Sequence, residues 1–455
     1  MSSSKHNNSP NSSQRGLFAT KLGVLAATVG SAVGLGNIWR FPYEAGMHGG
    51  SAFLIIYILF VLVLGIPAIC AEFVLGRATR QNAAGAFRRL GGGKFWPYVG
   101  IMGILCSFLI LGFYTVVAGW TLEYLFAAPF GEFNGADADT LHTRFDQLTS
   151  GWRPILWTLI FLAINFAIIG RGVQKGIEKL SNILMPILFL IIAAFAVNSL
   201  LMPGAKEGLT FLFHPDFSQL TSRTVISAMG QAFFSLSVGM GVLMTYASYF
   251  SDKTPLARTA CTTALLDTLV AIMSGVIIFP AVFSFGQQPE AGPRLVFEVL
   301  PAIFGHLPGG AFWATLFFLL LFVASITSTI SLSEVVVAYF IEEKGMTRKK
   351  AILVEAAGVT VLAVLSALSF GPLAEFTIGG LTIFNLLDFL TAGILMPLGG
   401  MLICIYAGWK LKKRVRKEQL LEGERRERVL VGCISFCLRY IAPAAIAVVF
   451  IFGLL

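Results

Sequence analysis

The sequence predicts an all-α membrane protein of about 11 transmembrane helices, built as an inverted repeat of five plus five helices. Of its 455 residues, 56% are hydrophobic and 13% are charged, whereas soluble domains carry roughly 25% charged residues. The apolar residues gather in eleven long segments, and ~20 apolar residues are needed to cross ~30 Å of hydrocarbon. Each segment is expected to be a helix, because a helix satisfies its own backbone hydrogen bonds in lipid.

The eleven segments divide the chain into two halves and an appendage. They are expected at 18–43, 48–76, 97–127, 152–170, 178–202, 221–251, 257–285, 311–341, 349–370, 381–409 and 429–454. The predicted organisation is a disordered cytoplasmic tail (1–14), a first repeat (15–205), an inverted second repeat (206–411), a basic cytoplasmic loop (412–428) and an accessory eleventh helix (429–455).

The basic residues predict how the chain lies in the membrane. With the N-terminus inside, 26 of the 33 Lys and Arg residues fall in inner segments and five in outer loops. This asymmetry follows the positive-inside rule and places the protein in the cell membrane with a cytoplasmic N-terminus. The net charge of +9 is therefore an orientation signal, and no nucleic-acid partner is expected.

No catalytic or cofactor motif is visible. The six cysteines lie in apolar runs and read as small buried hydrophobes. No histidine lies in mid-span beside a Ser or Cys nucleophile, and neither HExxH nor GxSxG occurs. The sequence therefore predicts no enzyme and no cofactor.

Two glycine motifs interrupt the first and sixth segments. Val33-Gly34-Leu35-Gly36 and Val238-Gly239-Met240-Gly241 lie 205 residues and five segments apart. Glycine allows a helix to unwind, and unwound backbone in a membrane is tolerated where it lines a cavity. Close packing of small residues is the alternative interpretation. Matching interruptions in two inverted halves favour a transporter binding site.

The first motif continues as Gly34-Leu35-Gly36-Asn37-Ile38-Trp39-Arg40-Phe41-Pro42-Tyr43. This stretch resembles the neurotransmitter:sodium symporters, and among them the bacterial amino acid transporters. The resemblance covers about residues 15–411. Further matches are Ser248-Tyr249-Phe250-Ser251-Asp252, Leu300-Pro301-Ala302-Ile303-Phe304, and Gly176 with Pro186.

The resemblance implies two sodium sites built from oxygen ligands, as a hard cation requires. The first is expected to use Ala32, Asn37, Ser235 and Asp267, together with the substrate carboxylate. The second is expected to use Gly30, Val33, Ala324, Thr327 and Ser328. Read alone, the hydroxyls near Thr327 could instead bond back to carbonyls of the preceding turn.

Asp267 is the only acid in its segment. An acid within hydrocarbon is costly and is a functional candidate by default, although a paired structural acid is the alternative. Chloride-dependent relatives have Asn at this position and bind chloride nearby. A fixed carboxylate would supply that negative charge, so we expect transport to be independent of chloride.

The resemblance also implies the substrate site. The substrate amine and carboxylate are expected to meet backbone groups and hydroxyls of Ala32, Leu35, Gly36, Tyr114, Phe234 and Ser237. The side-chain pocket is expected to comprise Ile110, Phe234, Met240, Ser328 and Leu332. Gly34 stands where aminergic relatives carry Asp, which favours an α-amino acid with an apolar side chain. Met240 is adaptable and would admit aromatic side chains.

Gates are expected above and below this site. Arg40 and Asp388 match the extracellular ion pair of the family, over a lid of Tyr114 and Phe234. On the inner side, the resemblance pairs Arg15 with Glu342, near Tyr249 and beneath Phe18. Two further residues are expected to act as braces: Glu72 between the two unwound stretches, and Gln231 near Arg40.

The sequence thus predicts a sodium-coupled symporter that imports hydrophobic, including aromatic, L-amino acids by alternating access. Its partners are the amino acid, two sodium ions and the lipid bilayer, and a monomer is expected to be sufficient for transport. A proton- or exchange-coupled amino acid transporter of the same fold is the alternative.

Overall fold

The computed structural model describes residues 17–289, 295–420 and 425–454. Within these ranges the chain forms helices and connecting turns and contains no strand. The predicted all-α class is confirmed. The predicted tail (1–14) and the predicted gate residue Arg15 lie outside the described residues.

The described helices account for the expected segments. Eight are long and apolar enough to cross a membrane, or up to ten if each of two bent pairs is one span. One bent pair forms the first expected segment, with a bend of 44°. The other joins Asp139–Ser150, which precedes the fourth expected segment, to Arg153–Ile169, with a bend of 69°. The sixth segment is not among these spans because its break leaves two short helices, Ser222–Ser235 and Val242–Ala247.

The first five segments form the following elements: α1 (Lys21–Ala32), η1 (Gly36–Arg40) and α2 (Phe41–Met47); α3 (Ser51–Phe60), η2 (Val61–Gly65) and α4 (Ile66–Thr79); α6 (Trp96–Ala127) and η3 (Ala128–Phe130); α8 (Arg153–Ile169); η4 (Val173–Glu178) and α9 (Lys179–Leu200). The next five form α11 (Ser222–Ser235) and α12 (Val242–Ala247); α13 (Leu256–Ser284); α15 (Gly310–Lys344); α16 (Arg348–Leu368); α17 (Ile383–Asp388), η7 (Phe389–Leu395), α18 (Met396–Ile405) and η8 (Tyr406–Lys410).

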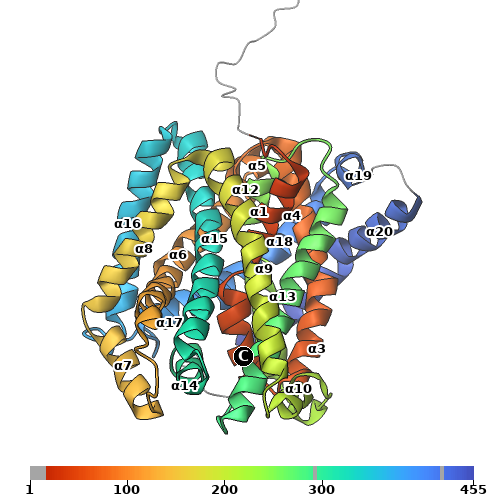
Figure 1. Ribbon diagram of the computed structural model, residues 1–455. Coiled ribbons are helices and arrows are strands. Elements are labelled where there is room, and N and C mark those ends of the chain that lie inside the picture. The colour runs from red at the N-terminus through yellow and green to blue at the C-terminus, as the bar shows by residue number, and fades with distance from the viewer. Residues whose placement is uncertain (1–16, 290–294, 421–424, 455) are drawn as a thin grey trace, which may run out of the picture.

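Shorter helices lie between the spans, and a further helical run follows them. The connecting elements are α5 (Ala83–Leu90), α7 (Ala138–Ser150), α10 (Ala205–Phe213), η5 (Phe217–Gln219), η6 (Leu295–Val299), α14 (Leu300–His306) and α19 (Lys413–Leu420). The eleventh segment is α20 (Arg425–Phe436), η9 (Cys437–Ile441) and α21 (Ala442–Leu454). Figure 1 shows α5, α12 and α19 at one end of the bundle and α7, α10 and α14 at the other.

Both predicted breaks occur at the glycine motifs. The first helix stops at Ala32 and resumes at Gly36. A Cβ on Gly34 would lie 2.3 Å from the Ser328 hydroxyl oxygen, so a larger residue here would require the Ser328 side chain to move. The second break runs from Leu236 to Gly241. There Gly239 has a φ of 85°, a backbone conformation that glycine adopts without steric cost.

The two breaks meet in the interior of the bundle. The first half of the first span, α1, packs against α9, α13 and α15. The longest helices, α6 and α15, pack along each other beside it. Unwound backbone from both broken spans therefore faces side chains of two continuous helices. Such an arrangement can form a binding site, because backbone groups freed from helical hydrogen bonds line the space between the helices.

Candidate functional site

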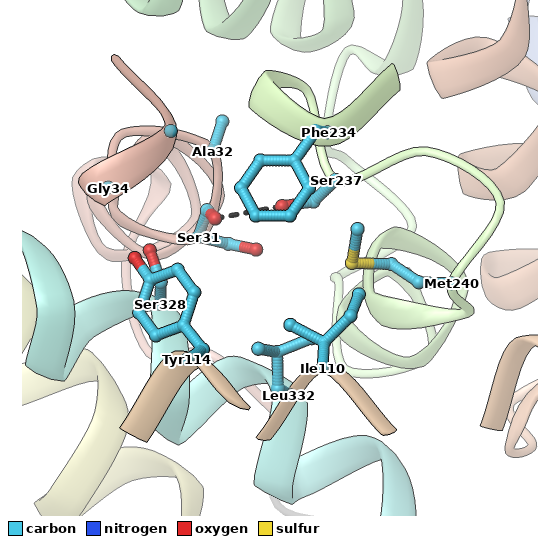
Figure 2. Close-up of a pocket in the computed structure, with 11 residues that line it drawn as sticks. Ser31, Ala32, Gly34, Ile110, Tyr114, Phe234, Ser237, Met240, Ser328 and Leu332 are labelled. Carbon is cyan, nitrogen blue, oxygen red and sulfur yellow. Dashed lines mark hydrogen bonds between the residues drawn. The ribbon is translucent and has the colours of Figure 1, made fainter. Parts of the chain in front are cut away.

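A small cavity lies between the two breaks, α6 and α15, and Figure 2 shows its lining. Nine of the ten residues predicted to contact substrate line it: Ala32, Gly36, Ile110, Tyr114, Phe234, Ser237, Met240, Ser328 and Leu332. The tenth, Leu35, donates its backbone N–H to the Tyr114 hydroxyl at 2.8 Å. Two lining residues were not predicted as substrate contacts, Ser31 and Gly34.

The cavity has a polar side and an apolar side. The hydroxyls of Tyr114 and Ser328 lie beside the break in the first span, whereas Ile110, Met240 and Leu332 face them across the space (Figure 2). The described lining contains no acid. The arrangement suits a small ligand with a polar head and an apolar side chain.

Three of the four residues predicted for the first sodium site form one buried network, and the fourth, Ala32, lines the cavity. The Asn37 amide donates to the Asp267 carboxylate at 2.7 Å and to the Ser235 hydroxyl at 2.9 Å. Ser235 in turn donates to Asp267 at 2.7 Å. The Tyr57 hydroxyl lies 3.3 Å from Ser235 and 3.4 Å from Asp267. Sequence reasoning missed Tyr57, because a tyrosine in an apolar run carries no local signal of a polar partner.

The residues predicted for the second site lie where α1 meets α15. A Cβ on Gly30 would lie 3.5 Å from the Cβ of Thr327, so the two helices touch at this point. The Thr327 hydroxyl donates to the carbonyls of Val323 at 3.0 Å and Ala324 at 3.1 Å. These are the hydrogen bonds to the preceding turn that the sequence offered as an alternative. They also place the hydroxyl beside the Ala324 carbonyl, another predicted ligand of the second sodium site.

Ser328 completes this second cluster. Its hydroxyl donates to the Val33 carbonyl across the two helices at 3.5 Å. The carbonyl belongs to the first residue beyond α1, where no further helical turn follows to donate an N–H group to it. The cluster therefore combines a freed carbonyl with two hydroxyls.

The predicted outer pair is formed. An Arg40 Nη lies 3.0 Å from an Asp388 carboxylate oxygen. The Arg40 guanidinium lies 4.8 Å above the centre of the Phe234 ring. The Phe234 and Tyr114 rings lie 6.5 Å apart, centre to centre. Arginine, phenylalanine and tyrosine thus form successive layers between the outer end of the bundle and the cavity.

The inner end is closed by aromatic packing. Phe18 is 5% exposed and meets the rings of Tyr246, Tyr249 and Phe250 at 5.8 to 6.2 Å. Its backbone N–H donates to the Tyr249 carbonyl at 3.0 Å. The start of the first span is thereby attached to the end of the sixth.

Two acids of α15 make hydrogen bonds near this end of the bundle. Glu342 accepts hydrogen bonds from the backbone and side chain of Asn82 at 2.7 and 3.0 Å; its predicted partner Arg15 is outside the described residues. Glu334 accepts a hydrogen bond from the Tyr249 hydroxyl at 2.8 Å and pairs with Arg348. Sequence reasoning did not find Arg348, which reads locally as one of several basic residues at the start of a helix.

Glu72 is fully buried and accepts two backbone hydrogen bonds, from Gly239 at 2.8 Å and Met244 at 3.2 Å. Both donors belong to the second broken span. The prediction that Glu72 bridges both breaks is therefore wrong. Among the described residues, its hydrogen bonds join it to the second broken span alone. The reason is geometric, because the left-handed turn at Gly239 and the start of α12 present free N–H groups to it.

Other side chains connect the two breaks. The Ser237 hydroxyl donates to the Ser31 carbonyl at 2.9 Å (Figure 2). Gln231 donates to the Gly36 carbonyl at 2.7 Å. The predicted contact of Gln231 is thus corrected: it braces the point where the first helix resumes, and within the described part of the chain no hydrogen bond joins it to Arg40.

Glu178 is a further residue that sequence reasoning missed. It is 4% exposed and accepts hydrogen bonds from the backbone of Ala19 at 2.9 Å and Thr20 at 3.1 Å. The Thr20 hydroxyl also donates to it at 3.1 Å. A carboxylate at the start of α1 complements the unpaired N–H groups and the positive end of the helix dipole.

Comparisons with known proteins agree with this architecture. The sequence matches the model of the Sodium:neurotransmitter symporter family over residues 15–132 and 129–455. The crystal structure of MhsT in complex with L-phenylalanine is similar, with a TM-score of 0.91 and 43% identity over 96% of this chain and 100% of that chain.

Two bacterial proteins are similar over nearly their whole length. An uncharacterised sodium-dependent transporter of Bacillus subtilis, YhdH, is 36% identical over 435 residues, which is 95% of this chain and 96% of the relative. An uncharacterised sodium-dependent transporter of Haemophilus influenzae is 35% identical over 456 residues, 98% of this chain and 99% of the relative. The chain is therefore a multi-span, sodium-coupled membrane transporter and not an enzyme, and it belongs to the sodium:neurotransmitter symporter family.

Proposed function

We propose that this chain imports hydrophobic L-amino acids, aromatic ones included, together with two sodium ions and without a requirement for chloride. The observation that carries the proposal is the two-sided cavity between the helix breaks. Its polar side can receive an α-carboxylate and an α-amine, and its apolar side can receive the side chain. Support also comes from MhsT, whose crystal structure holds L-phenylalanine.

The roles within the cavity follow from the groups that the breaks expose. The substrate carboxylate would meet the N–H groups of Leu35 and Gly36 and the Tyr114 hydroxyl, beside the first sodium. The amine would meet the carbonyls of Ala32 and Phe234. Met240 sets the far wall, and its flexible side chain leaves room for rings of different size.

Two sodium ions are proposed because two separate oxygen clusters flank the cavity. One surrounds Asp267, whose carboxylate supplies a full negative charge within the bundle. The other combines the Val33 carbonyl with the hydroxyls of Thr327 and Ser328. Both clusters include a group of the broken first span, the Asn37 side chain in one and the Val33 carbonyl in the other. Ion binding would therefore stabilise one arrangement of that span against α13 and α15.

Alternating access would use the two closed ends. Release of Arg40 from Asp388 would open the outer path, and withdrawal of Phe18 from the ring cluster near Tyr249 would open the inner path. Bound sodium and substrate would join the breaks to α6 and α15 and so favour outer closure. The protein would act as a monomer, since the cavity is complete within one chain. Its N-terminus would lie in the cytoplasm, the side on which the basic loops are expected.

Uptake into proteoliposomes would test this function. We expect an inward sodium gradient at equal pH to drive accumulation of hydrophobic members of a panel of the twenty amino acids. An interior-negative potential would increase it, because two charges moving through 100 mV gain about 4.6 kcal/mol. The control replaces sodium with potassium. Equal accumulation driven by a proton gradient without sodium would contradict the proposal and favour proton coupling.

Replacement of external chloride by gluconate is expected to leave sodium-driven uptake unchanged. The physical reason is that Asp267 would provide, permanently and in place, the negative charge that chloride supplies in other members. Initial rates in chloride and in gluconate, at matched sodium and osmolarity, measure this. A collapse of uptake in gluconate would show that Asp267 does not replace the anion.

A further inference from the structure

A second acid, Glu44, lies beside the outer ion pair. It follows Arg40 by one helical turn and is 9% exposed. One carboxylate oxygen lies 3.5 Å from Arg40 Nε and accepts a hydrogen bond from the Tyr43 hydroxyl at 3.0 Å. The other accepts a hydrogen bond from Ser227 and lies 3.4 Å from Nε2 of His48. Glu44 is thus held in place by groups on the outer halves of both broken spans.

Arg40 therefore has two acidic partners that belong to different elements, α2 and α17. Asp388 reaches it from α17 through an Nη, at 3.0 Å. Glu44 reaches it from its own span through Nε, at 3.5 Å, and is joined to α11 through Ser227. A motion that separates α17 from the outer half of the first span breaks the first ion pair and keeps the second.

The second partner changes the cost of opening. The Arg40 side chain is 11% exposed, and a guanidinium left without a partner in such a place is strongly destabilised, because burial removes the water that would otherwise solvate its charge. Glu44 remains available to Arg40 in both positions of α17. The acid that closes the gate and the acid that holds the arginine when it is open would then be different residues.

We propose that Glu44 is the open-state partner of Arg40, a positioning residue that competes with Asp388 and so sets how readily the outer gate opens. The inference rests on the gate role proposed above for Arg40 and Asp388. It follows that removing the charge of Glu44 leaves Asp388 as the sole acid on Arg40, which favours the closed gate. Removing the charge of Asp388 has the opposite effect.

The test measures how fast tritiated L-phenylalanine dissociates from the purified, sodium-loaded protein in nanodiscs. We expect Asp388→Asn to accelerate dissociation several-fold and Glu44→Gln to slow it several-fold. In transport, Glu44→Gln is expected to lower both kcat and KM, because a gate that opens less often retains substrate and turns over slowly. Glu44→Asp, which keeps the charge, should lie between Glu44→Gln and the unchanged protein.

The matched control is Glu132→Gln, which removes an exposed acid from its ion pair with Arg144 and should leave dissociation unchanged. If Glu44→Gln accelerates dissociation or leaves it unchanged while Asp388→Asn accelerates it, the competition is refuted and the gate stands. If Asp388→Asn has no effect on dissociation, the proposed gate role of the Arg40–Asp388 pair is refuted, and the role of Glu44 that rests on it is refuted too. A merely structural role for Glu44 would not slow release, so the sign of the change decides.

Discussion

Replacing Asp267 with Asn is expected to raise the sodium concentration for half-maximal uptake about tenfold or more. Asp267 is fully buried and is the charged member of the cluster with Asn37 and Ser235. At an effective dielectric constant near 20, a unit charge about 4 Å from a cation contributes about 4 kcal/mol, and about 1.4 kcal/mol corresponds to a factor of ten. Initial uptake rates across a sodium titration measure the shift.

The matched control for this experiment is Asp139→Asn, at an exposed acid near the start of α7. It removes the same charge from the same chain and should leave the sodium dependence unchanged. The thermal unfolding midpoint of Asp267→Asn without sodium reports any general loss of packing. An unaltered sodium dependence in a folded Asp267→Asn protein would exclude the carboxylate as a sodium ligand.

Replacing Glu72 with Gln is expected to lower the free energy of unfolding by about 1–3 kcal/mol and to reduce transport severely. The carboxylate accepts the backbone N–H groups of Gly239 and Met244 with separate oxygens. A glutamine offers one oxygen, so one buried N–H loses its acceptor, and such a loss costs about 1–3 kcal/mol. Chemical unfolding in detergent and sodium-driven uptake together measure the two effects.

The same substitution at another buried glutamate provides the control. Glu355, on α16, is fully buried, and neither of its carboxylate oxygens accepts a hydrogen bond from a backbone N–H among the described residues. Glu355→Gln therefore leaves no backbone donor without an acceptor and should be better tolerated than Glu72→Gln. Equal losses in the two variants would mean that the backbone bonds of Glu72 do not support the second break.

Much of the site was predictable because it is carried by local patterns. The run from Gly34 to Tyr43 determines where the first helix stops and resumes, and the structure has the break at the predicted glycines. Nine of the ten predicted substrate residues share one cavity. Arg40 and Asp388, far apart in the chain, were predicted as a pair from the family motif and lie 3.0 Å apart.

The rest depends on tertiary packing that no local pattern encodes. Glu178 follows Gly176 in a stretch with lysines on both sides, so it reads as a surface charge; its partners at Ala19 and Thr20 come from the other end of the first repeat. The role of Tyr57 could not be predicted for the same reason, since its polar neighbours lie on α11 and α13, far away in the sequence. The 69° bend between α7 and α8 likewise follows from how two segments pack and not from their apolar content.

The carboxylate of Glu178 has a consequence for how the inner end can move. Three donors from two successive residues, Ala19 and Thr20, converge on this single side chain. Loss of these hydrogen bonds one after another would leave the buried Glu178 carboxylate with too few donors. Detachment of the start of α1 from η4 should therefore be cooperative. The inner end of α1 should therefore switch between attached and detached states, with few intermediate positions, and the Glu178 carboxylate should lengthen the attached state.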